Sequence, residues 1–279
     1  MRHDHVILER SDGIHFSTFT PAMELDAAHI ALYAAYFVLG AVVSLINSIA
    51  GGGSTLSLPI MIFLGLPATV ANGTNRIGLI IGNFSSALNL ARHGYLNLKL
   101  FFQLLIPTFL GALLGACFLV RIGDKLFQAI LAVVICLVVV MSNLNKNILG
   151  KPPENPPEKL TFKGALGFFV IALYGCIVQV GVGFVQIFGL TRYTGLAPVQ
   201  INALKNALTN VFLLVSTFAL GMTGKINWPI AIIMAGGAWV GGYFGSFLQR
   251  KKGNKFIQRF ISICSIGMAI ALVVDLIVK

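Results

Sequence analysis

Two basic side chains lie inside long apolar stretches of this 279-residue chain, and each has an asparagine about one helical turn before it. Arg76 comes four residues after Asn72, and Lys205 comes three residues after Asn202. Residues three or four apart share one face of a helix, so each amide is expected beside its cation. A cation within a membrane is costly unless it is paired, which makes such a residue a candidate for function.

No acidic residue is positioned in the sequence to pair with either cation. The nine Asp and Glu residues occur in the N-terminal tail, in the segment 146–163, and at Asp124 and Asp275. The sequence therefore predicts that a bound anion supplies the missing negative charge. Two further amides, Asn75 and Asn206, adjoin the cations and could donate N–H groups to the oxygens of such an anion.

A structural role is the alternative for these polar residues. If Arg76 or Lys205 lies near a membrane interface, its side chain would reach water or bond the carbonyl groups at a helix end. The four asparagines would equally serve as helix caps. Asn47 and Gln179 are weaker candidates for ligand binding, each about one turn before a glycine, and His93 is expected to face solvent in a loop.

A glycine-rich interruption precedes each of these polar regions. The first is the run of three glycines and a serine after a long apolar stretch, and in the second Val182 separates two glycines. Each leads into a short apolar segment, whose first N–H groups and positive dipole end would attract an anion. The alternative is that the glycines only let two backbones approach. The candidate binding residues are Gly51, Gly52, Gly53, Ser54, Asn72, Asn75, Arg76, Gln179, Gly181, Gly183, Asn202, Lys205 and Asn206.

Composition indicates an all-α membrane protein with many spans. The chain is 57% apolar and 10% charged, with a mean hydropathy of +0.87. A span needs about 20 apolar residues, and two segments, 54–65 and 184–190, are too short for one. Each half is therefore expected to contain four long transmembrane helices and one short broken or re-entrant helix. The long segments are 27–49, 72–90, 100–120, 126–144, 162–180, 201–220, 228–248 and 256–276.

The second half of the chain repeats the first at one offset of 130 residues, the separation of Gly51 from Gly181. The same offset pairs Asn72 with Asn202, so glycines and polar residues coincide, which indicates a duplication. The distribution of Lys and Arg among the loops favours five crossings per half, and an odd number inverts the second copy. The expected parts are a polar tail (1–26), repeat 1 (27–145), a charged proline-rich linker (146–163) and repeat 2 (164–279).

Several function classes are disfavoured by the distribution of polar residues. The net charge of +11 comes from residues in short loops, as membrane orientation requires, so no nucleic acid partner is expected. The four cysteines occur singly within apolar runs, and no metal site or cofactor is predicted. No catalytic cluster lies within the spans, so we do not expect an enzyme. Glycines four residues apart, Gly111 with Gly115 and Gly241 with Gly245, are typical of close helix packing.

At these positions the sequence resembles the sulfite exporter TauE/SafE family of bacterial permeases. The resemblance covers nearly all of residues 27–279 and rests on the segment 47–54, the turn 72–76, the loop 94–96 and the counterparts around 181–183 and 202–206. It implies a membrane permease for sulfite, organosulfonates or related small oxyanions. The second copy departs from the pattern at Val182, which interrupts its glycine run.

The expected function is therefore outward transport of a small oxyanion by a multi-pass protein of the bacterial cytoplasmic (inner) membrane. An inside-negative potential drives each negative charge outward by about 2.3 kcal/mol per 100 mV. Because the apolar core lacks a carboxylate other than Asp275, a facilitated or potential-driven carrier is favoured over a proton antiporter. The alternative is a permease for another small metabolite or ion, in which Arg76 and Lys205 are structural. The sequence leaves open which anion is carried, the direction and the coupling ion of transport, and whether the two short segments cross the membrane or re-enter it. It also leaves open the conformational state and the oligomeric state, for which a homo-oligomer is one option.

Overall fold

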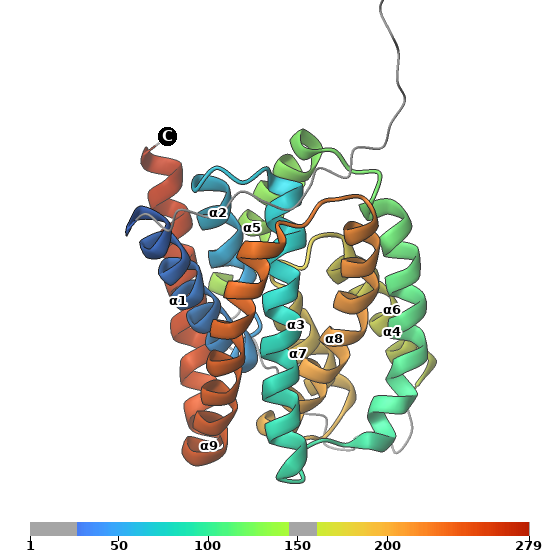
Figure 1. The fold of residues 1–279 in the computed structure, drawn as a ribbon. Coiled ribbons are helices and arrows are strands. Elements are labelled where there is room, and N and C mark those ends of the chain that lie inside the picture. The colour runs from blue at the N-terminus through green and yellow to red at the C-terminus, as the bar shows by residue number, and fades with distance from the viewer. Residues whose placement is uncertain (1–26, 145–160, 279) are drawn as a thin grey trace, which may run out of the picture.

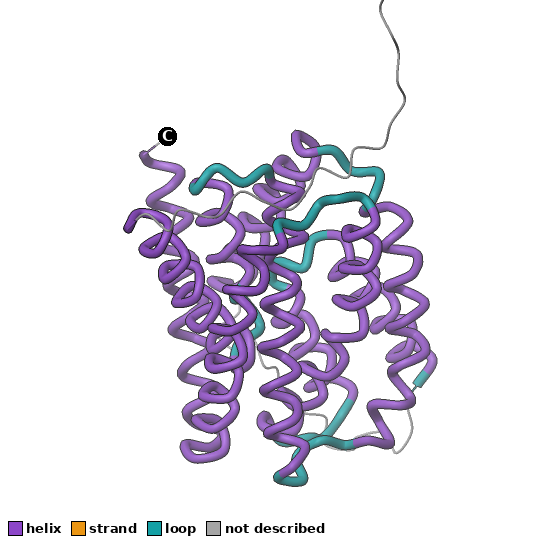
Figure 2. The backbone as a smooth tube through the Cα atoms, in the orientation of Figure 1, coloured by secondary structure: helices purple, strands orange, loops and turns teal. Residues whose placement is uncertain are grey.

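Helices make up every regular element in the part of the chain that the computed structural model describes, residues 27–144 and 161–278 (Figures 1 and 2). The predicted all-α fold is confirmed for these residues. The predicted tail and most of the predicted linker lie outside them, and Phe162 and Lys163, assigned above to the linker, begin a helix. The helices are α1 (Ala27–Ile49), α2 (Ser54–Phe63), α3 (Ala68–Arg92), α4 (Leu98–Leu119), α5 (Asp124–Leu144), α6 (Phe162–Ile177), α7 (Val182–Tyr193), α8 (Pro198–Met222) and α9 (Trp228–Val278).

Both halves contain the same series of five helical segments. The long helix α9 has a non-helical residue at Gly253, with φ of 70° and ψ of −168°, so it consists of two helices joined at a kink. The equivalent position in the first half, Gly123, lies between α4 and α5. The bounds of α3 and α8 differ by the repeat offset at both ends, and α4 and α9 also start at equivalent residues.

Four of the described helices are long and apolar enough to cross a membrane, in the ranges His29–Ile49, Leu98–Leu119, Pro198–Met222 and Trp228–Gly253. The prediction of four long spans in each half is therefore met only in part. Helix α6 is shorter than predicted, with 16 residues. Helix α3 has 25 residues, but its many Asn and Ser side chains and Arg76 lower its hydropathy.

Equivalent loops of the two halves lie at opposite ends of the molecule. In Figure 1 the loop between α3 and α4 is at the bottom, whereas the loop between α8 and α9 is near the top. Helices α3 and α8 consequently run in opposite directions through the bundle.

One long helix of each half packs closely against helices of the other half. Helix α4 packs on α6 and α8, and α9 packs on α1 and α3. These contacts depend on glycine: a methyl group at Gly111 would overlap the carbonyl oxygen of Phe169 in α6, and one at Gly241 would overlap that of Ala41 in α1. The predicted small-residue stripes therefore do pack against neighbouring helices, and the two halves form one interlocked bundle.

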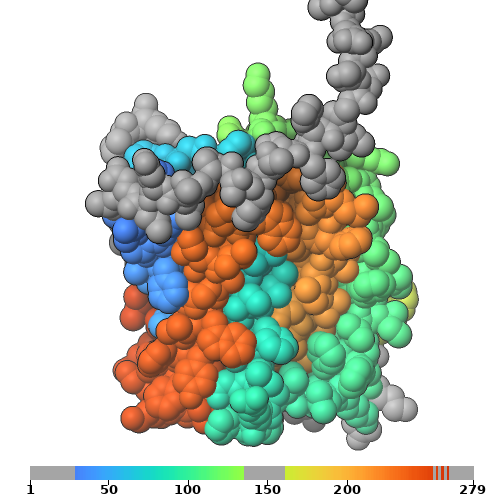
Figure 3. Space-filling view, viewed as in Figure 1, coloured from blue at the N-terminus to red at the C-terminus, as the bar shows by residue number. Residues whose placement is uncertain are grey.

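Apolar side chains cover the outside of the bundle and polar ones lie within it. Figure 3 shows a face formed by α9, α3, α8 and α4, and on these helices large side chains such as Phe102, Phe218 and Trp239 are exposed. In contrast, α3 buries four asparagines as well as Arg76. This distribution suits a protein whose surface faces lipid and whose polar groups must find partners inside.

Candidate functional site

The two predicted interruptions lie against each other inside the bundle. The chain turns between α1 and α2 at Gly51, with φ of 83°, and between α6 and α7 at Gly181, with φ of 70°, a left-handed conformation that glycine adopts easily. The backbones of Gly51 and Gly183 touch so closely that a methyl group on either would overlap the other residue. Close backbone approach is therefore one role of these glycines.

The remaining residues of the first interruption begin α2. The carbonyl of Gly52 accepts hydrogen bonds from the amide and hydroxyl groups of Thr55. Gly53 packs against the backbone carbonyl of Val43, and Ser54 is buried as the first residue of α2. The starts of α2 and α7, next to the touching glycines, present helix N-termini, whose first N–H groups lack partners within the helix.

Arg76 is completely buried and binds the C-terminal end of α6. Its Nη2 donates to the carbonyl oxygens of Cys176 (2.7 Å) and Ile177 (3.3 Å) and to Asn72 Oδ1 (3.3 Å), while Nη1 donates to the hydroxyl of Ser216. Helix C-termini carry partial negative charge, so this position stabilises a cation. A basic residue of the first half therefore caps a broken helix of the second half.

Lys205 makes the reciprocal contact with the first half. Its side chain is 1% exposed, and Nζ donates to the carbonyl oxygens of Asn47 (2.7 Å) and Ser48 (3.1 Å) at the end of α1. The sequence left two structural alternatives for these cations, contact with water or bonds to the carbonyls at a helix end. Both cations bond helix-end carbonyls, and neither reaches solvent. The helix ends supply negative partial charge that could not be recognised in the sequence.

Amide side chains extend the Lys205 cluster. Asn206 Nδ2 donates to Ser48 O (3.3 Å) and to Ser86 Oγ (2.8 Å). Asn202 Nδ2 donates to Gln249 Oε1 (2.8 Å), and Gln249 Nε2 donates to the same Ser48 carbonyl (3.3 Å). The structure therefore brings Asn202, Lys205 and Asn206 together at the C-terminal end of α1.

On the other side, Gln179 lies beside Asn72. Gln179 is buried, has a left-handed φ of 56°, and donates from Nε2 to the backbone carbonyl of Asn72 (3.4 Å). Few residues other than glycine adopt this conformation, and they often do so at functional sites. The predicted residues Asn72, Arg76 and Gln179 are thus neighbours. Because all four candidate asparagines lie within α3 or α8, none of them is a helix cap.

Several buried polar atoms of the two clusters have no hydrogen-bond partner among the described residues. On α3 they include the donors Asn72 Nδ2, Asn75 Nδ2 and Arg76 Nε, together with Asn75 Oδ1. On α8 they are the acceptors Asn202 Oδ1 and Asn206 Oδ1. Buried polar groups are nearly always hydrogen-bonded, so a group of so many unpartnered donors and acceptors needs an explanation.

The structure adds residues that the sequence analysis missed. Ser216 and Ser86 had a signal, because the repeat offset pairs them with each other, as it pairs Arg76 with Asn206. The bonds of Arg76 to Ser216 and of Asn206 to Ser86 are thus equivalent contacts in the two halves. Asn83 and Gln249 had no such signal, since both of their equivalents are leucines. Asn83 accepts from Asn47 Nδ2 (2.9 Å).

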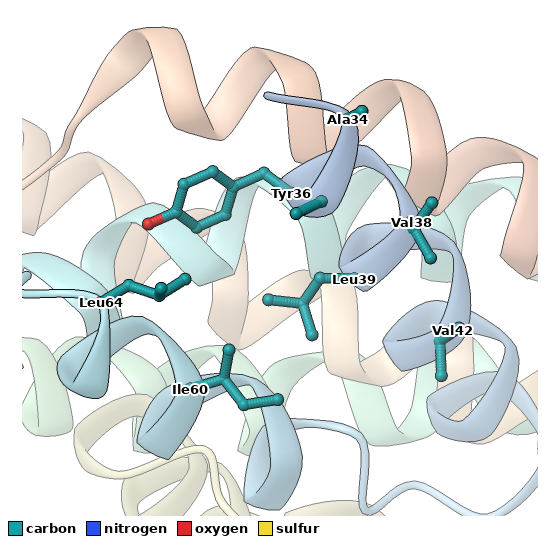
Figure 4. A pocket seen from close by; sticks show the side chains of 8 residues that line it. Ala34, Tyr36, Val38, Leu39, Val42, Ile60 and Leu64 are labelled. Atoms are coloured by element: carbon teal, nitrogen blue, oxygen red, sulfur yellow. The ribbon is translucent and has the colours of Figure 1, made fainter. Parts of the chain in front are cut away.

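The described residues also form an apolar groove, which suits a small anion less well than the polar clusters do. This groove of about 470 Å³ lies between α1 and α2, lined by Ala34, Ala35, Tyr36, Val38, Leu39, Val42, Ile60 and Leu64 (Figure 4). None of these is a candidate binding residue. Within the described ranges no three His, Cys, Asp or Glu side chains gather as a metal site would require.

Comparison with known proteins gives a consistent class. Residues 36–272 match the family model described as sulfite exporter TauE/SafE. The chain is 28% identical over 245 residues to the probable membrane transporter protein ORF9 of Sinorhizobium sp., covering 88% of this chain and 93% of that protein. It is 29% identical over 257 residues to a probable membrane transporter protein of Haemophilus influenzae, covering 88% and 96%. It is also 28% identical over 245 residues to the probable membrane transporter protein YfcA of Escherichia coli K12, covering 86% and 88%. No solved structure matches the chain.

Proposed function

Because this chain belongs to the sulfite exporter TauE/SafE family of membrane transporters, we propose that it carries a small oxyanion, such as sulfite or a short organosulfonate, out of the cell. The family and the four apolar helices identify a multi-pass membrane protein, which we assign to the bacterial cytoplasmic membrane. The observation that carries the proposal is the group of buried, unpartnered N–H donors on α3, at Asn72, Asn75 and Arg76. Oxygens bound to sulfur in an anion are acceptors that such donors suit.

The anion would bind beside α3, next to the contact between Gly51 and Gly183. Arg76 supplies a permanent charge and a planar set of donors, of which Nε is unpartnered. The N-terminal ends of α2 and α7 would add N–H groups and positive dipole ends, as broken helices do in other transporters. The contact of Gly51 with Gly183 supports this location, because it joins the two breaks, and Gln179, two residues before Gly181, bonds Asn72 of α3.

An inverted repeat would give this site access to both membrane faces in turn. Residues 27–145 and 164–279 are the two halves, and the opposite ends occupied by their equivalent loops in Figure 1 support an inverted arrangement. In transporters built this way, the substrate site lies near the midplane where the halves meet. The inside-negative potential then favours outward movement of an anion by about 2.3 kcal/mol per unit charge at 100 mV.

Thermal unfolding of the detergent-solubilised protein tests the site. We expect sulfite, thiosulfate or a short sulfonate to raise the melting temperature of the wild type, since a ligand at 100 times its Kd contributes about 2.7 kcal/mol. Arg76→Gln should lose this response. Arg92→Gln is the matched control, because Arg92 is an exposed arginine at the end of the same helix. Equal stabilisation of both variants by the same anion would disprove the role of Arg76.

Flux measurements test the function itself. Wild-type proteoliposomes loaded with labelled sulfite or methanesulfonate should release it faster than empty liposomes do. Gly52→Val should block release, because a branched side chain would cover the start of α2 where the anion is expected. Normal release by Gly52→Val, at wild-type levels of folded protein, would remove the helix N-terminus from the site.

A permease for a cation or a neutral metabolite is the second candidate. The observation that favours it is that both Arg76 and Lys205 already bond helix-end carbonyls, so both could be purely structural. In that case no anion would stabilise the wild type. A response to sulfate, thiosulfate or a sulfonate that is lost in Arg76→Gln excludes this candidate.

A further inference from the structure

The two halves place different cations at neighbouring positions of the repeat. The offset pairs Asn75 with Lys205 and Arg76 with Asn206, so the amide and the cation have exchanged order. This difference has chemical consequences. Arginine stays protonated in proteins, whereas a buried lysine can lose its proton. Around Arg76, three N–H donors are unpartnered, as in an anion site, together with the acceptors Asn75 Oδ1 and Gln179 Oε1. At Asn202 and Asn206, beside Lys205, only oxygen acceptors are unpartnered.

The Lys205 ammonium occupies a cation site built from oxygens. Its Nζ lies 2.7 Å from Asn47 O and 3.1 Å from Ser48 O, at the C-terminal end of the broken helix α1. The unpartnered oxygens Asn202 Oδ1 and Asn206 Oδ1 belong to residues of the same cluster. Exposed carbonyls at the C-terminal ends of broken helices are where transporters hold their coupling cations.

Only one of the two carbonyls that bind the ammonium would lose its partner if the ammonium left this site. Ser48 O accepts from three donors, Lys205 Nζ, Asn206 Nδ2 and Gln249 Nε2. A carbonyl oxygen has two lone pairs, so the two amides alone would satisfy it. Release of Lys205 would therefore expose one carbonyl, that of Asn47, rather than two.

Among the side chains that the structure describes, no ionised carboxylate fixes Lys205 in its charged form. Helix α8 packs against α1, α3, α4, α6, α7 and α9. The carboxyl and imidazole groups of those helices are limited to His29, exposed at the start of α1, and Asp275 near the end of α9. Their other ionisable side chains are Arg, Lys, Tyr and Cys, and none of those whose side chains the structure describes bonds Lys205. The charge of the ammonium is balanced by carbonyl dipoles, so it depends on the position of the α1 end.

We propose that Lys205 is the coupling site of this transporter and that its coupling ion is the proton. The proposal rests on the transport function proposed above. With α1 in the position seen here, the ammonium fills the oxygen site. When the site opens to one side, an N–H bond breaks, the nitrogen keeps the electron pair and a water molecule takes the proton. The reverse transfer occurs on the other side. The sequence favoured a facilitated or potential-driven carrier because it offers no suitable carboxylate to carry a proton. In this proposal the amine of Lys205 carries the proton instead.

Coupled flux in proteoliposomes tests the proposal. The probe is methanesulfonate, which carries no titratable proton of its own near neutral pH, together with a pH-sensitive dye trapped inside. We expect a methanesulfonate gradient to move protons in the wild type. Lys205→Arg keeps the charge and the donors but cannot release a proton, so the number of protons moved per labelled methanesulfonate released should fall at least tenfold.

Lys225→Arg is the matched control. Lys225 also donates to two backbone carbonyls, those of Val120 (3.4 Å) and Ile122 (3.1 Å), but it lies in the loop between α8 and α9. This variant should couple as the wild type does. Methanesulfonate flux without proton movement in the wild type would overturn the proposal, and so would unchanged proton movement in Lys205→Arg.

A second measurement needs no substrate. In protein labelled with ¹³C at lysine Cε, the Lys205 signal is the one missing from Lys205→Arg, or from Lys205→Gln if the arginine variant does not fold. We expect this signal to shift between about pH 5 and about pH 9, as an amine that exchanges its proton must. A signal that stays constant over this range overturns the proposal, whatever the substrate. A shifting signal in a protein that transports none of the tested anions would count against the proposed function alone.

Discussion

The hydroxyl groups of Ser216 and Ser86 make equivalent contacts with different partners, which allows the role of Arg76 to be isolated. Ser216→Ala removes a partner of the Arg76 guanidinium, and Ser86→Ala removes a partner of Asn206. Loss of one buried hydrogen-bond partner should reduce stability by about 1–3 kcal/mol in either variant. Only Ser216→Ala should also weaken sulfite binding, because it leaves Arg76 less well oriented.

The measurement is the melting temperature of each variant with and without sulfite. Similar unfolding in the absence of ligand, with a smaller sulfite response in Ser216→Ala alone, is the expected pattern. If both variants lose the response to the same extent, the two clusters do not differ in function and the assignment of the anion to the α3 side is wrong.

Asp124, at the start of α5 and outside the apolar spans, predicts a dependence of stability on acid pH. Its carboxylate accepts from the backbone N–H and the hydroxyl of Thr69, both at 2.8 Å, and the charge of Lys225 adds to the effect. These interactions hold the pKa of Asp124 below its ordinary value in the folded protein. A lowered pKa stabilises the fold above the ordinary carboxyl pKa, and this contribution is lost as the pH falls through the lower, folded value.

We therefore expect Asp124→Asn to be less stable than the wild type at neutral pH. As the pH falls from about 5 to about 3, the difference should shrink, because the wild-type carboxylate takes up its proton over this range. Melting temperatures across the range provide the check. A difference that is constant with pH would mean that packing of Asp124, and not its charge, links α3 to α5.

At the scale of the helices, the sequence predicted where the chain must break but not how far each helix extends. Gly51 and Gly181 are recognisable because only glycine adopts their conformation easily, and both breaks occur where predicted. In contrast, α3 begins at Ala68, four residues before the predicted start at 72, because residues 68–71 are compatible with a helix and follow directly on Pro67. Hydropathy marks the apolar part of a helix, whereas hydrogen bonding sets its ends.

The contact between α9 and α1 predicts that small residues are required for folding. A methyl group at Gly241 would overlap the Ala41 carbonyl oxygen, so Gly241→Ala must separate the two helices or shift their backbones. Overpacking of this kind costs about 1–3 kcal/mol, and more where backbone is in the way. We expect a clearly lower melting temperature and less folded protein in size-exclusion chromatography.

Gly167→Ala is the control for this prediction. Gly167 lies within α6, and an added methyl group would meet nothing within 4 Å. The substitution should leave stability unchanged or raise it by up to about 1 kcal/mol, since alanine is the better helix former. If Gly241→Ala unfolds at the same temperature as Gly167→Ala, the bundle can relax at this contact, and the stripe is not needed for packing.

At the scale of the whole molecule, the helix-end partners of the two cations could not be predicted from the sequence. Cys176 and Ile177 are 100 and 101 residues from Arg76, and Asn47 is 158 residues from Lys205. Both sets of partners are backbone carbonyls, which every residue carries, so no residue type marks them. The candidate residues were recognisable because a buried charge is unusual, but their reciprocal capping of the two broken helices follows only from the way the halves interlock.

The opposite placement of equivalent loops leads to a prediction for the intact cell. His93 and Thr223 are related by the repeat offset, are exposed, and lie in the loops after α3 and α8. Arg92 and Lys99 flank the first of these loops, and basic residues favour the cytoplasmic side. An inverted repeat then puts Thr223 outside. In His93→Cys and Thr223→Cys, a membrane-impermeant thiol reagent applied to intact cells should therefore label only Thr223→Cys above the wild-type background. His93→Cys should become reactive after permeabilisation. Labelling of both variants in intact cells would mean that the two loops lie on the same face of the membrane and that the halves are parallel. Two parallel halves could not expose the site to each membrane face in turn by exchanging their conformations.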